Sequence, residues 1–195
     1  ALLDQLHRLK LELSRKLPSF HGLPPVSIKT PNSVSSKPAA AQDVLDIQKV
    51  VLNVGLQILK KLYGTDETVS GEKAYWELGV ENMDIKLEAT RKQQMSPREK
   101  RAPKEAYLEL VDYIKISKQA NNWPEFSKVF SIQLPEEKKG KTYYLDWIER
   151  VNQLRRTAAH QNALRGFQDA DFEFVEWLKQ ALYANVEAAG YTTEA

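Results

Sequence analysis

The stretch WIERVNQLRRTAAHQ, residues 147–161, carries an arginine and a histidine, Arg155 and His160, with four residues between them. A histidine has an unperturbed pKa of about 6.5, so near neutral pH it can take a proton from a ribose 2′-hydroxyl or give one to a leaving oxygen. An arginine can stabilise the extra negative charge that a phosphate carries in the transition state. This pair could therefore support RNA cleavage without a metal ion.

The two side chains must be positioned by a helix, because the stretch has helical periodicity. At about 100° per residue, one arc of roughly 80° predicts a core face made of Tyr144, Trp147, Val151, Leu154 and Ala158. The other side is wider, about 140°, and carries Asn152, Arg155, Arg156, Ala159 and His160. Arg156 and His160 are stacked on an ideal helix, whereas Arg155 and His160 are not. Three arrangements could still bring an arginine and a histidine together: the helix breaks before His160, the long Arg155 side chain reaches around the helix, or a second copy of the helix completes the site.

The bare pattern has a second interpretation, in which His160 is a solvent-facing or capping histidine. Arg15 and His21 form a similar pair elsewhere in the chain. Pro18 interrupts that pair and removes the helical frame. The spacing alone is therefore weak evidence for a reaction centre.

Composition excludes several classes of protein. The 195 residues include no cysteine and three histidines, so disulfides and thiolate metal sites are excluded. The histidines His7, His21 and His160 lie too far apart in sequence to suggest a metal cluster, and no cofactor is expected. No window approaches the roughly 18 apolar residues of a membrane span, so a cytoplasmic protein is the default expectation, with a nuclear one left open.

Three regions follow one another along the chain. Residues 1–20 form an expected amphipathic helix with Leu2, Leu6, Leu9, Leu13 and Leu17 on one side. It either docks on the rest of the protein or is the remnant of a coiled coil. Residues 21–41 are rich in proline and serine and predict a linker, and residues 42–190 predict a helical domain. The sequence starts in helical pattern without Met, which favours a piece of a longer chain over removal of the initiator Met.

Within the predicted domain every periodic segment follows the helical period, so the fold class is all-α. The first helix should end at Gly64 and bury Val44, Ile47, Val51, Val54, Ile58 and Leu62. Further helices are expected over 66–95, with an interruption near Gly79, over 104–118, and from Pro124. The last helix should bury Phe172, Val175, Leu178, Leu182 and Val186.

A run of basic residues extends from the end of the second of these helices to the start of the third. It consists of Arg91, Lys92, Arg98, Lys100, Arg101 and Lys104. The run is either a solvated loop or a patch that contacts the phosphate backbone of a nucleic acid. The net charge of +2 does not by itself indicate a nucleic-acid binder.

The segment VNQLRRTAAHQ resembles the LN-x-x-R-N-x-x-x-H motif of the HEPN superfamily, all-α domains whose hallmark is an arginine, four to six residues and a histidine. Upstream, YLELVDYIKISKQANNWPEFSKVF is similar to the helix and Trp-containing turn of a HEPN branch found at the end of larger RNA-processing or prokaryotic defence proteins. The resemblance covers residues 100–188 and extends back to 42, but not to the leucine helix.

Carried over residue by residue, the resemblance implies Arg155 as the motif arginine, His160 as the motif histidine and Asn152 as a supporting polar residue. Arg156 is a departure, since active members have Asn, Asp or His after the motif arginine. Many HEPN domains are also non-catalytic.

Three hypotheses follow. The first is an RNA-directed HEPN domain, a metal-independent endoribonuclease in which Arg155 and His160 form a composite site across a homodimer. The second is a non-catalytic dimerisation or interaction module of a larger multidomain protein. The third is a helical docking segment of an ATPase or helicase.

Overall fold

The chain was analysed as a computed structural model, which describes residues 37–134, 140, 143–159 and 167–194. The predicted leucine helix, residues 1–20, and most of the predicted linker lie outside these ranges. Over the described ranges the protein is helical, and its one β-type pairing is an isolated bridge between Glu67 and Lys73. The all-α prediction is confirmed for this part of the chain.

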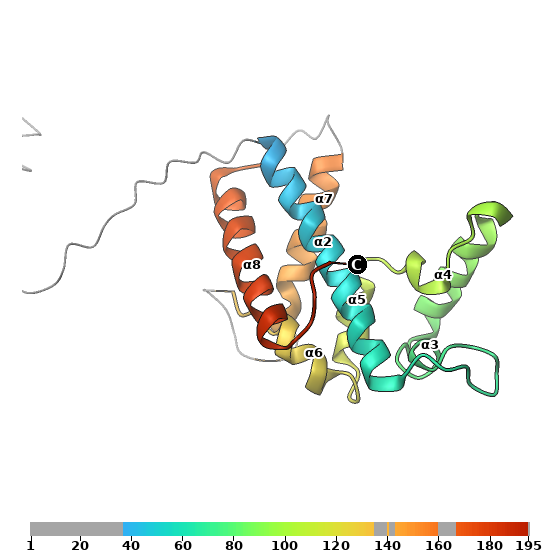
Figure 1. Cartoon of the computed structure of the whole chain (residues 1–195). Helices are drawn as coiled ribbons and strands as arrows, with labels where there is room; N and C mark the ends of the chain where they lie inside the picture. Colours follow the sequence, from blue (N-terminus) through green and yellow to red (C-terminus); the bar gives the residue numbers. More distant parts are fainter. Residues whose placement is uncertain (1–36, 135–139, 141–142, 160–166, 195) are drawn as a thin grey trace, which may run out of the picture. The chain divides into compact units, whose positions relative to one another are not determined.

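The central element is α2, Lys37–Tyr63. It contacts the short helix α3, the helices α5 and α6, and the two helices α7 and α8 (Figure 1). The other helices are α3 (Ala74–Glu77), α4 (Met83–Met95), α5 (Asp112–Lys118), α6 (Trp123–Phe130), α7 (Asp146–Ala159) and α8 (Asp169–Ala188). Within the described ranges, three 3₁₀ turns lie between these helices: η1 (Arg98–Lys100), η2 (Lys104–Tyr107) and η3 (Tyr143–Leu145).

Helix α2 starts earlier than the sequence indicates, because residues 37–41 belong to the helix and not to the linker. Pro38 lies in the first turn, where a backbone N–H would have no partner within the helix, so proline costs nothing there. Three alanines follow, and alanine is the strongest helix former. The helix ends as predicted at Gly64, which has φ +80°.

The predicted core face of α2 is confirmed in all but its last member. Its side chains at Val44, Ile47, Val51, Val54 and Ile58 are fully buried. Leu62 is 38% exposed. The segment around Gly79 packs instead against Leu59 and Tyr63, on another side of the final turn.

The helices predicted over 66–95 and 104–118 are shorter than expected, because polar side chains form hydrogen bonds that stabilise non-helical segments. Residues 64–73 form a loop in which the Thr68 and Ser70 hydroxyls donate to the Glu77 carboxylate. Over 104–118 the chain forms η2 and then α5, since the Glu109 N–H donates to Asp112 Oδ2 at 2.8 Å instead of continuing a helix.

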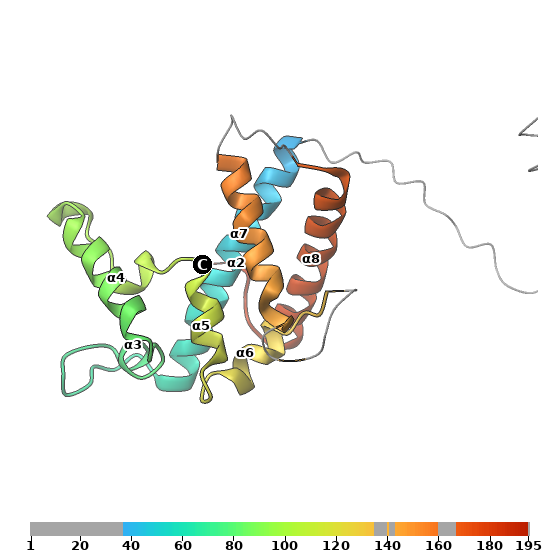
Figure 2. The same cartoon turned by 180° about the vertical axis from the view of Figure 1, so that it is seen from behind.

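The remaining core lies between α2, α6, α7 and α8, which Figures 1 and 2 show as neighbouring helices. Trp147, Val151 and Leu154 are buried as predicted, and Pro124 lies in the first turn of α6. On α8 the predicted positions Val175, Leu178, Leu182 and Val186 are buried. Phe172 is only partly buried, and Phe174 is buried in addition.

Gly55 allows α2 to approach α5 closely. A Cβ at this position would lie 2.1 Å from Cε1 of Tyr113, a ring that is 1% exposed and whose hydroxyl donates to the Leu52 carbonyl at 3.2 Å. Gly55→Ala should therefore destabilise the protein by about 1 to 3 kcal/mol, although alanine has the higher helix propensity. Urea denaturation measures this. Gln153→Ala, at an exposed position, serves as the reference variant. A Gly55→Ala protein as stable as the unmodified protein, or more stable, would contradict the close approach of α2 to α5.

Candidate functional site

Helix α7 presents the predicted site residues on its last two turns. Arg155 is half-buried, and its Nη2 donates to Oδ1 of Asn152 at 3.2 Å. Arg156 and Ala159 are exposed. His160 lies outside the described residues, so the predicted pairing of Arg155 with His160 remains a prediction.

The sequence placed Asn152 on the polar side of α7, and this is wrong, because Asn152 is 2% exposed. Ile148 lies one turn before it on the same side of the helix and is fully buried. The buried arc of α7 therefore includes the side that bears Ile148 and Asn152, as well as Trp147, Val151 and Leu154 of the predicted face. Tyr144, which was also predicted on that face, lies in η3 and is only partly buried. Asn152 supports Arg155 from the core rather than beside it on the surface.

Two nitrogens of this pair are buried without a hydrogen-bond partner among the described residues: Nδ2 of Asn152 and Nε of Arg155. A buried donor that lacks an acceptor costs roughly 1 to 3 kcal/mol. The pair thus combines an arginine oriented by a buried amide with donor capacity that the described residues leave unused. The exposed part of the half-buried Arg155 guanidinium can contact a phosphate or a carboxylate, whereas its buried Nε cannot.

The basic residues predicted to bind nucleic acid are largely engaged with acidic side chains. Arg91 forms a two-bond ion pair with Glu88, at 2.8 and 2.6 Å. Lys92 pairs with Glu109, and Lys104 pairs with Glu72. Three of the six cations are therefore neutralised locally.

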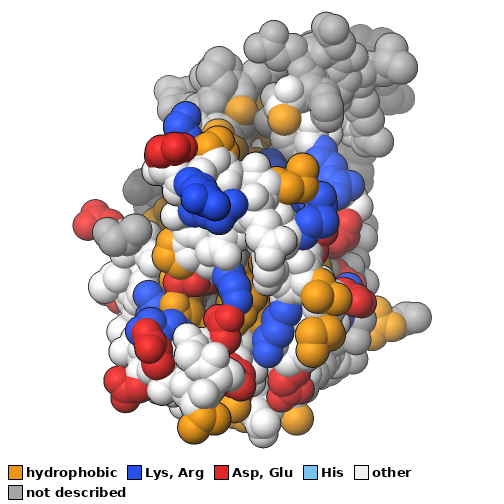
Figure 3. Space-filling model, turned by 90° about the vertical axis from the view of Figure 1, so that its right-hand side faces the viewer, with side chains coloured by type: hydrophobic (Ala, Val, Ile, Leu, Met, Phe, Trp, Pro, Cys, Tyr) orange, Lys and Arg blue, Asp and Glu red, His pale blue; other side chains and the backbone are white. Residues whose placement is uncertain are grey.

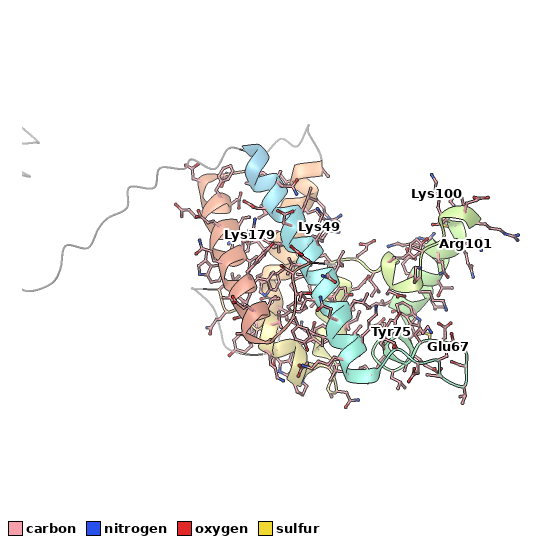
Figure 4. All side chains as sticks on the ribbon, viewed as in Figure 1. Lys49, Glu67, Tyr75, Lys100, Arg101 and Lys179 are labelled. Atoms are coloured by element: carbon pink, nitrogen blue, oxygen red, sulfur yellow. The ribbon has the colours of Figure 1, made fainter. Side chains whose placement is uncertain are left out.

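The other three basic residues differ among themselves. Arg101 donates to the backbone carbonyls of Ser96 and Gln94, at 3.2 and 3.0 Å, although it is exposed. Arg98 and Lys100 are exposed and form no ion pair with a described residue. Figure 4 shows Lys100 and Arg101 at the outer end of α4. Figure 3, which faces this side, shows basic, acidic and hydrophobic side chains intermixed rather than a continuous basic surface.

The run of basic residues and the region around Arg155 do not form one continuous surface. Helix α4 stands apart from α7, α8 and the body of α2 in both views (Figures 1 and 2). The structure therefore does not bring together the two sets of predicted site residues.

One polar cluster was not predicted from the sequence. The Glu125 carboxylate, on α6, accepts hydrogen bonds from Lys128, from Lys61 on α2 at 2.6 Å and from the Tyr191 hydroxyl at 2.7 Å. These three donors, Lys128 first, lower the pKa of Glu125 to about 2. Glu125 is therefore ionised at neutral pH and cannot act as a general acid, so the cluster is best explained as a link between α2, α6 and the residues after α8.

A buried asparagine links the loops at the same, C-terminal end of α2. Asn122 accepts from the Tyr63 hydroxyl at 2.7 Å and donates to the carbonyls of Gly79 and Ile116, at 2.8 and 2.9 Å. Its partners lie up to 59 residues away in sequence, and no local pattern signals them.

Comparison with protein-family models, with curated proteins and with solved structures finds no match to the chain. The described residues also include no group of three or more His, Cys, Asp or Glu side chains that could hold a metal ion. No helix in the described ranges is long and apolar enough to cross a membrane. Functional assignment must therefore rest on the residues and their geometry.

Proposed function

We propose that this chain is an RNA-directed HEPN-type domain that acts as a metal-independent endoribonuclease, with Arg155 and His160 as its reacting groups. The observation that carries the proposal is the contact between Arg155 and the buried amide of Asn152 on the last turns of α7, just before His160. An arginine kept only for solubility needs no such support. The HEPN assignment itself rests on the sequence motif.

The proposed reaction is an attack of the ribose 2′-hydroxyl on the neighbouring phosphorus. His160 takes the 2′-hydroxyl proton while the 2′-oxygen bonds to phosphorus, and the bond from phosphorus to the 5′-oxygen of the next nucleotide breaks. A second proton donor protonates that oxygen. The products are a 2′,3′-cyclic phosphate and a free 5′-hydroxyl. Arg155 stabilises the negative charge that accumulates on the phosphate.

A homodimer would supply the second imidazole as His160 of another copy. The small and exposed side chain of Ala159, on the last turn of α7, leaves room for such an approach. Replacing Ala159 by Glu should then give monomers that remain folded, because two carboxylates would face each other across the interface. Sedimentation measures this, with the exposed Ala170→Glu on α8 as the matched control. If the unmodified protein were monomeric well above micromolar concentration, the proposal of a composite site would be contradicted.

RNA cleavage should persist in EDTA, because the reaction uses an imidazole and a guanidinium and no metal ion. DNA of the same sequence should remain intact, since it lacks the 2′-hydroxyl. Gel analysis of labelled RNA and DNA, incubated separately with the unmodified protein, measures both outcomes. Cleavage of DNA at a similar rate, or loss of RNA cleavage in EDTA, would contradict the proposed chemistry.

A second candidate function is a non-catalytic interaction module. Arg156 supports it, because it stands where the HEPN motif of active members has Asn, Asp or His, and a cation in the last turn of a helix is stabilising in itself. This second candidate predicts that the unmodified protein does not cleave RNA in the same gel assay. RNA binding would instead fall steeply with salt and weaken when Arg98 and Lys100 are replaced by Ala, whereas the ion-paired Lys104 should matter less.

A further inference from the structure

The loop that leads from α2 into α3 has oxygen-bearing residues at a regular spacing. Residues 66–77 read DETVSGEKAYWE. In the calcium-binding loop of an EF-hand, twelve residues supply ligands from positions 1, 3, 5, 7 and 12, position 7 through its backbone carbonyl, and position 6 is glycine. Counted from residue 66, the ligand positions are filled by Asp66, Thr68, Ser70, the Glu72 carbonyl and Glu77, with Gly71 at position 6.

Four of these five oxygen-bearing groups lie together in the folded loop. Oγ1 of Thr68 is 2.9 Å from Oγ of Ser70 and 3.1 Å from the Glu72 carbonyl oxygen. The Ser70 hydroxyl donates to Oε2 of Glu77 at 2.8 Å, and the Thr68 hydroxyl donates to the same oxygen. Neighbouring oxygens bound to one Ca²⁺ at 2.3 to 2.6 Å in a pentagonal bipyramid lie about 2.7 to 3.7 Å apart. The loop therefore holds its oxygens at the separations that calcium ligands have.

The backbone of the loop explains this convergence. Gly71 has φ +78°, the left-handed conformation that allows a sharp turn at position 6. Glu67 and Lys73 form an antiparallel bridge that closes the base of the turn. The Ala74 N–H donates to the Asp66 carbonyl at 2.9 Å, so the first residue of the loop lies next to the start of α3.

The charges of the loop suit a cation. Asp66 is exposed, and its carboxylate forms no ion pair with a described residue. Hydrogen bonds from the hydroxyls of Thr68 and then Ser70 lower the pKa of Glu77, which is therefore ionised at neutral pH. The ammonium of Lys73, at position 8, pairs with Glu67 at 3.2 Å.

We propose that residues 66–77 bind one Ca²⁺ ion. The ligands are the Asp66 and Glu77 carboxylates, the Thr68 and Ser70 hydroxyl oxygens and the Glu72 carbonyl oxygen. The two hydroxyl hydrogens, which point to Glu77 in the metal-free loop, turn outward when the oxygens bind the ion. Water supplies the remaining oxygens of the six to eight that Ca²⁺ takes. Only two ligands are acidic side chains, so the site is not a cluster of three or more His, Cys, Asp or Glu residues.

The ligand set favours calcium and predicts weak binding. Mg²⁺ requires nearly ideal octahedral geometry and gives up its water reluctantly, whereas Ca²⁺ accepts irregular sets of protein oxygens. Neutral hydroxyls at positions 3 and 5 reduce the ligand charge, so we expect a dissociation constant of roughly 10⁻⁴ to 10⁻³ M. Helix α3 has only 4 residues, so the comparison concerns the loop and not a complete EF-hand.

The loop lies away from the residues of the ribonuclease proposal. It follows the C-terminal end of α2, whereas the last turns of α7 lie beside the N-terminal end of α2 (Figures 1 and 2). Figure 4 labels Glu67 on the loop. Ca²⁺ should therefore stabilise the fold without taking part in RNA cleavage, and the inference uses neither Arg155 nor His160.

The test is isothermal titration calorimetry of the metal-free full chain with CaCl₂. One Ca²⁺ per chain should bind, and MgCl₂ should bind at least about tenfold more weakly. Asp66→Asn keeps the size of the side chain but removes a ligand charge, so it should weaken Ca²⁺ binding at least about tenfold. Glu67→Gln is the matched control, because it removes the same charge from the neighbouring position, which is not a ligand. It should change the affinity by less than about threefold.

Thermal unfolding gives a second readout. The melting temperature should be higher in CaCl₂ than in EDTA for the unmodified protein and for Glu67→Gln, because an ion that binds only the folded state stabilises it. Asp66→Asn should show little or none of this increase.

Three results would overturn the proposal. The first is no Ca²⁺ binding up to about 10 mM, well above the expected dissociation constant, by a protein that circular dichroism shows to be folded. The second is Mg²⁺ binding as tight as Ca²⁺ binding. The third is an equal loss of affinity in Asp66→Asn and Glu67→Gln, which would indicate general attraction to acidic residues. If Asp66→Asn does not fold, Glu77→Gln takes its place in the same comparison, since its amide oxygen still accepts from the Thr68 and Ser70 hydroxyls.

Discussion

Trp147→Ala is expected to lower the free energy of unfolding by about 3 to 5 kcal/mol. The Trp147 side chain is fully buried, and its Nε1 donates to the Phe130 carbonyl at 3.0 Å. Its ring also packs edge-on against the Phe130 ring, with centroids 6.1 Å apart. Alanine would leave a cavity between α6 and α7 and a buried carbonyl without its donor. Urea denaturation of the two proteins measures the difference.

The chain offers a matched control in Trp177, which is 37% exposed on α8. Trp177→Ala removes a side chain of the same size with little cavity, so it should cost clearly less, about 1 kcal/mol or below. If Trp147→Ala unfolded at the same urea concentration as the unmodified protein, the packing of α7 against α6 described above would be wrong.

His160→Ala should lower the rate of RNA cleavage by roughly 10² to 10⁴, the usual contribution of a proton-transfer group. Alanine cannot take the 2′-hydroxyl proton, while Arg155 and its contact with Asn152 are retained. Initial rates on a labelled RNA under single-turnover conditions measure the loss without the influence of product release.

Two further variants separate the site from general effects of charge. Arg156→Ala removes an exposed cation on the last turn of α7 and should reduce the rate less than His160→Ala does, if Arg155 is the phosphate contact. His7→Ala removes a histidine outside the motif and should leave the rate unchanged. Equal losses in His7→Ala and His160→Ala would contradict a specific role for His160.

The buried faces of the long helices could be predicted because burial repeats with the helical period. Val44 to Ile58 on α2 and Val175 to Val186 on α8 follow this rule. The breaks could not, since they depend on individual hydrogen bonds such as the one from the Glu109 N–H to Asp112. Periodicity detects a core face but not a competing local bond.

The site was predictable only in part, for two physical reasons. A helical wheel gives the direction of Asn152 but not the width of the arc that neighbouring helices cover, so its burial was missed. The basic run was visible, but its neutralisation was not, because Glu109 and Glu72 pair with Lys92 and Lys104 from 17 and 32 residues away. Such pairs form only after the chain has folded.

The central claim, that His160 catalyses attack by the ribose 2′-hydroxyl, is tested most directly by the chemistry of the cut ends. A labelled RNA incubated in EDTA with the unmodified protein should yield fragments that end in a 2′,3′-cyclic phosphate, identified by mass spectrometry. His160→Ala, purified in parallel, should yield them at least about a hundredfold more slowly. Equal yields from both proteins, or no cyclic phosphate from the unmodified protein, would contradict the account.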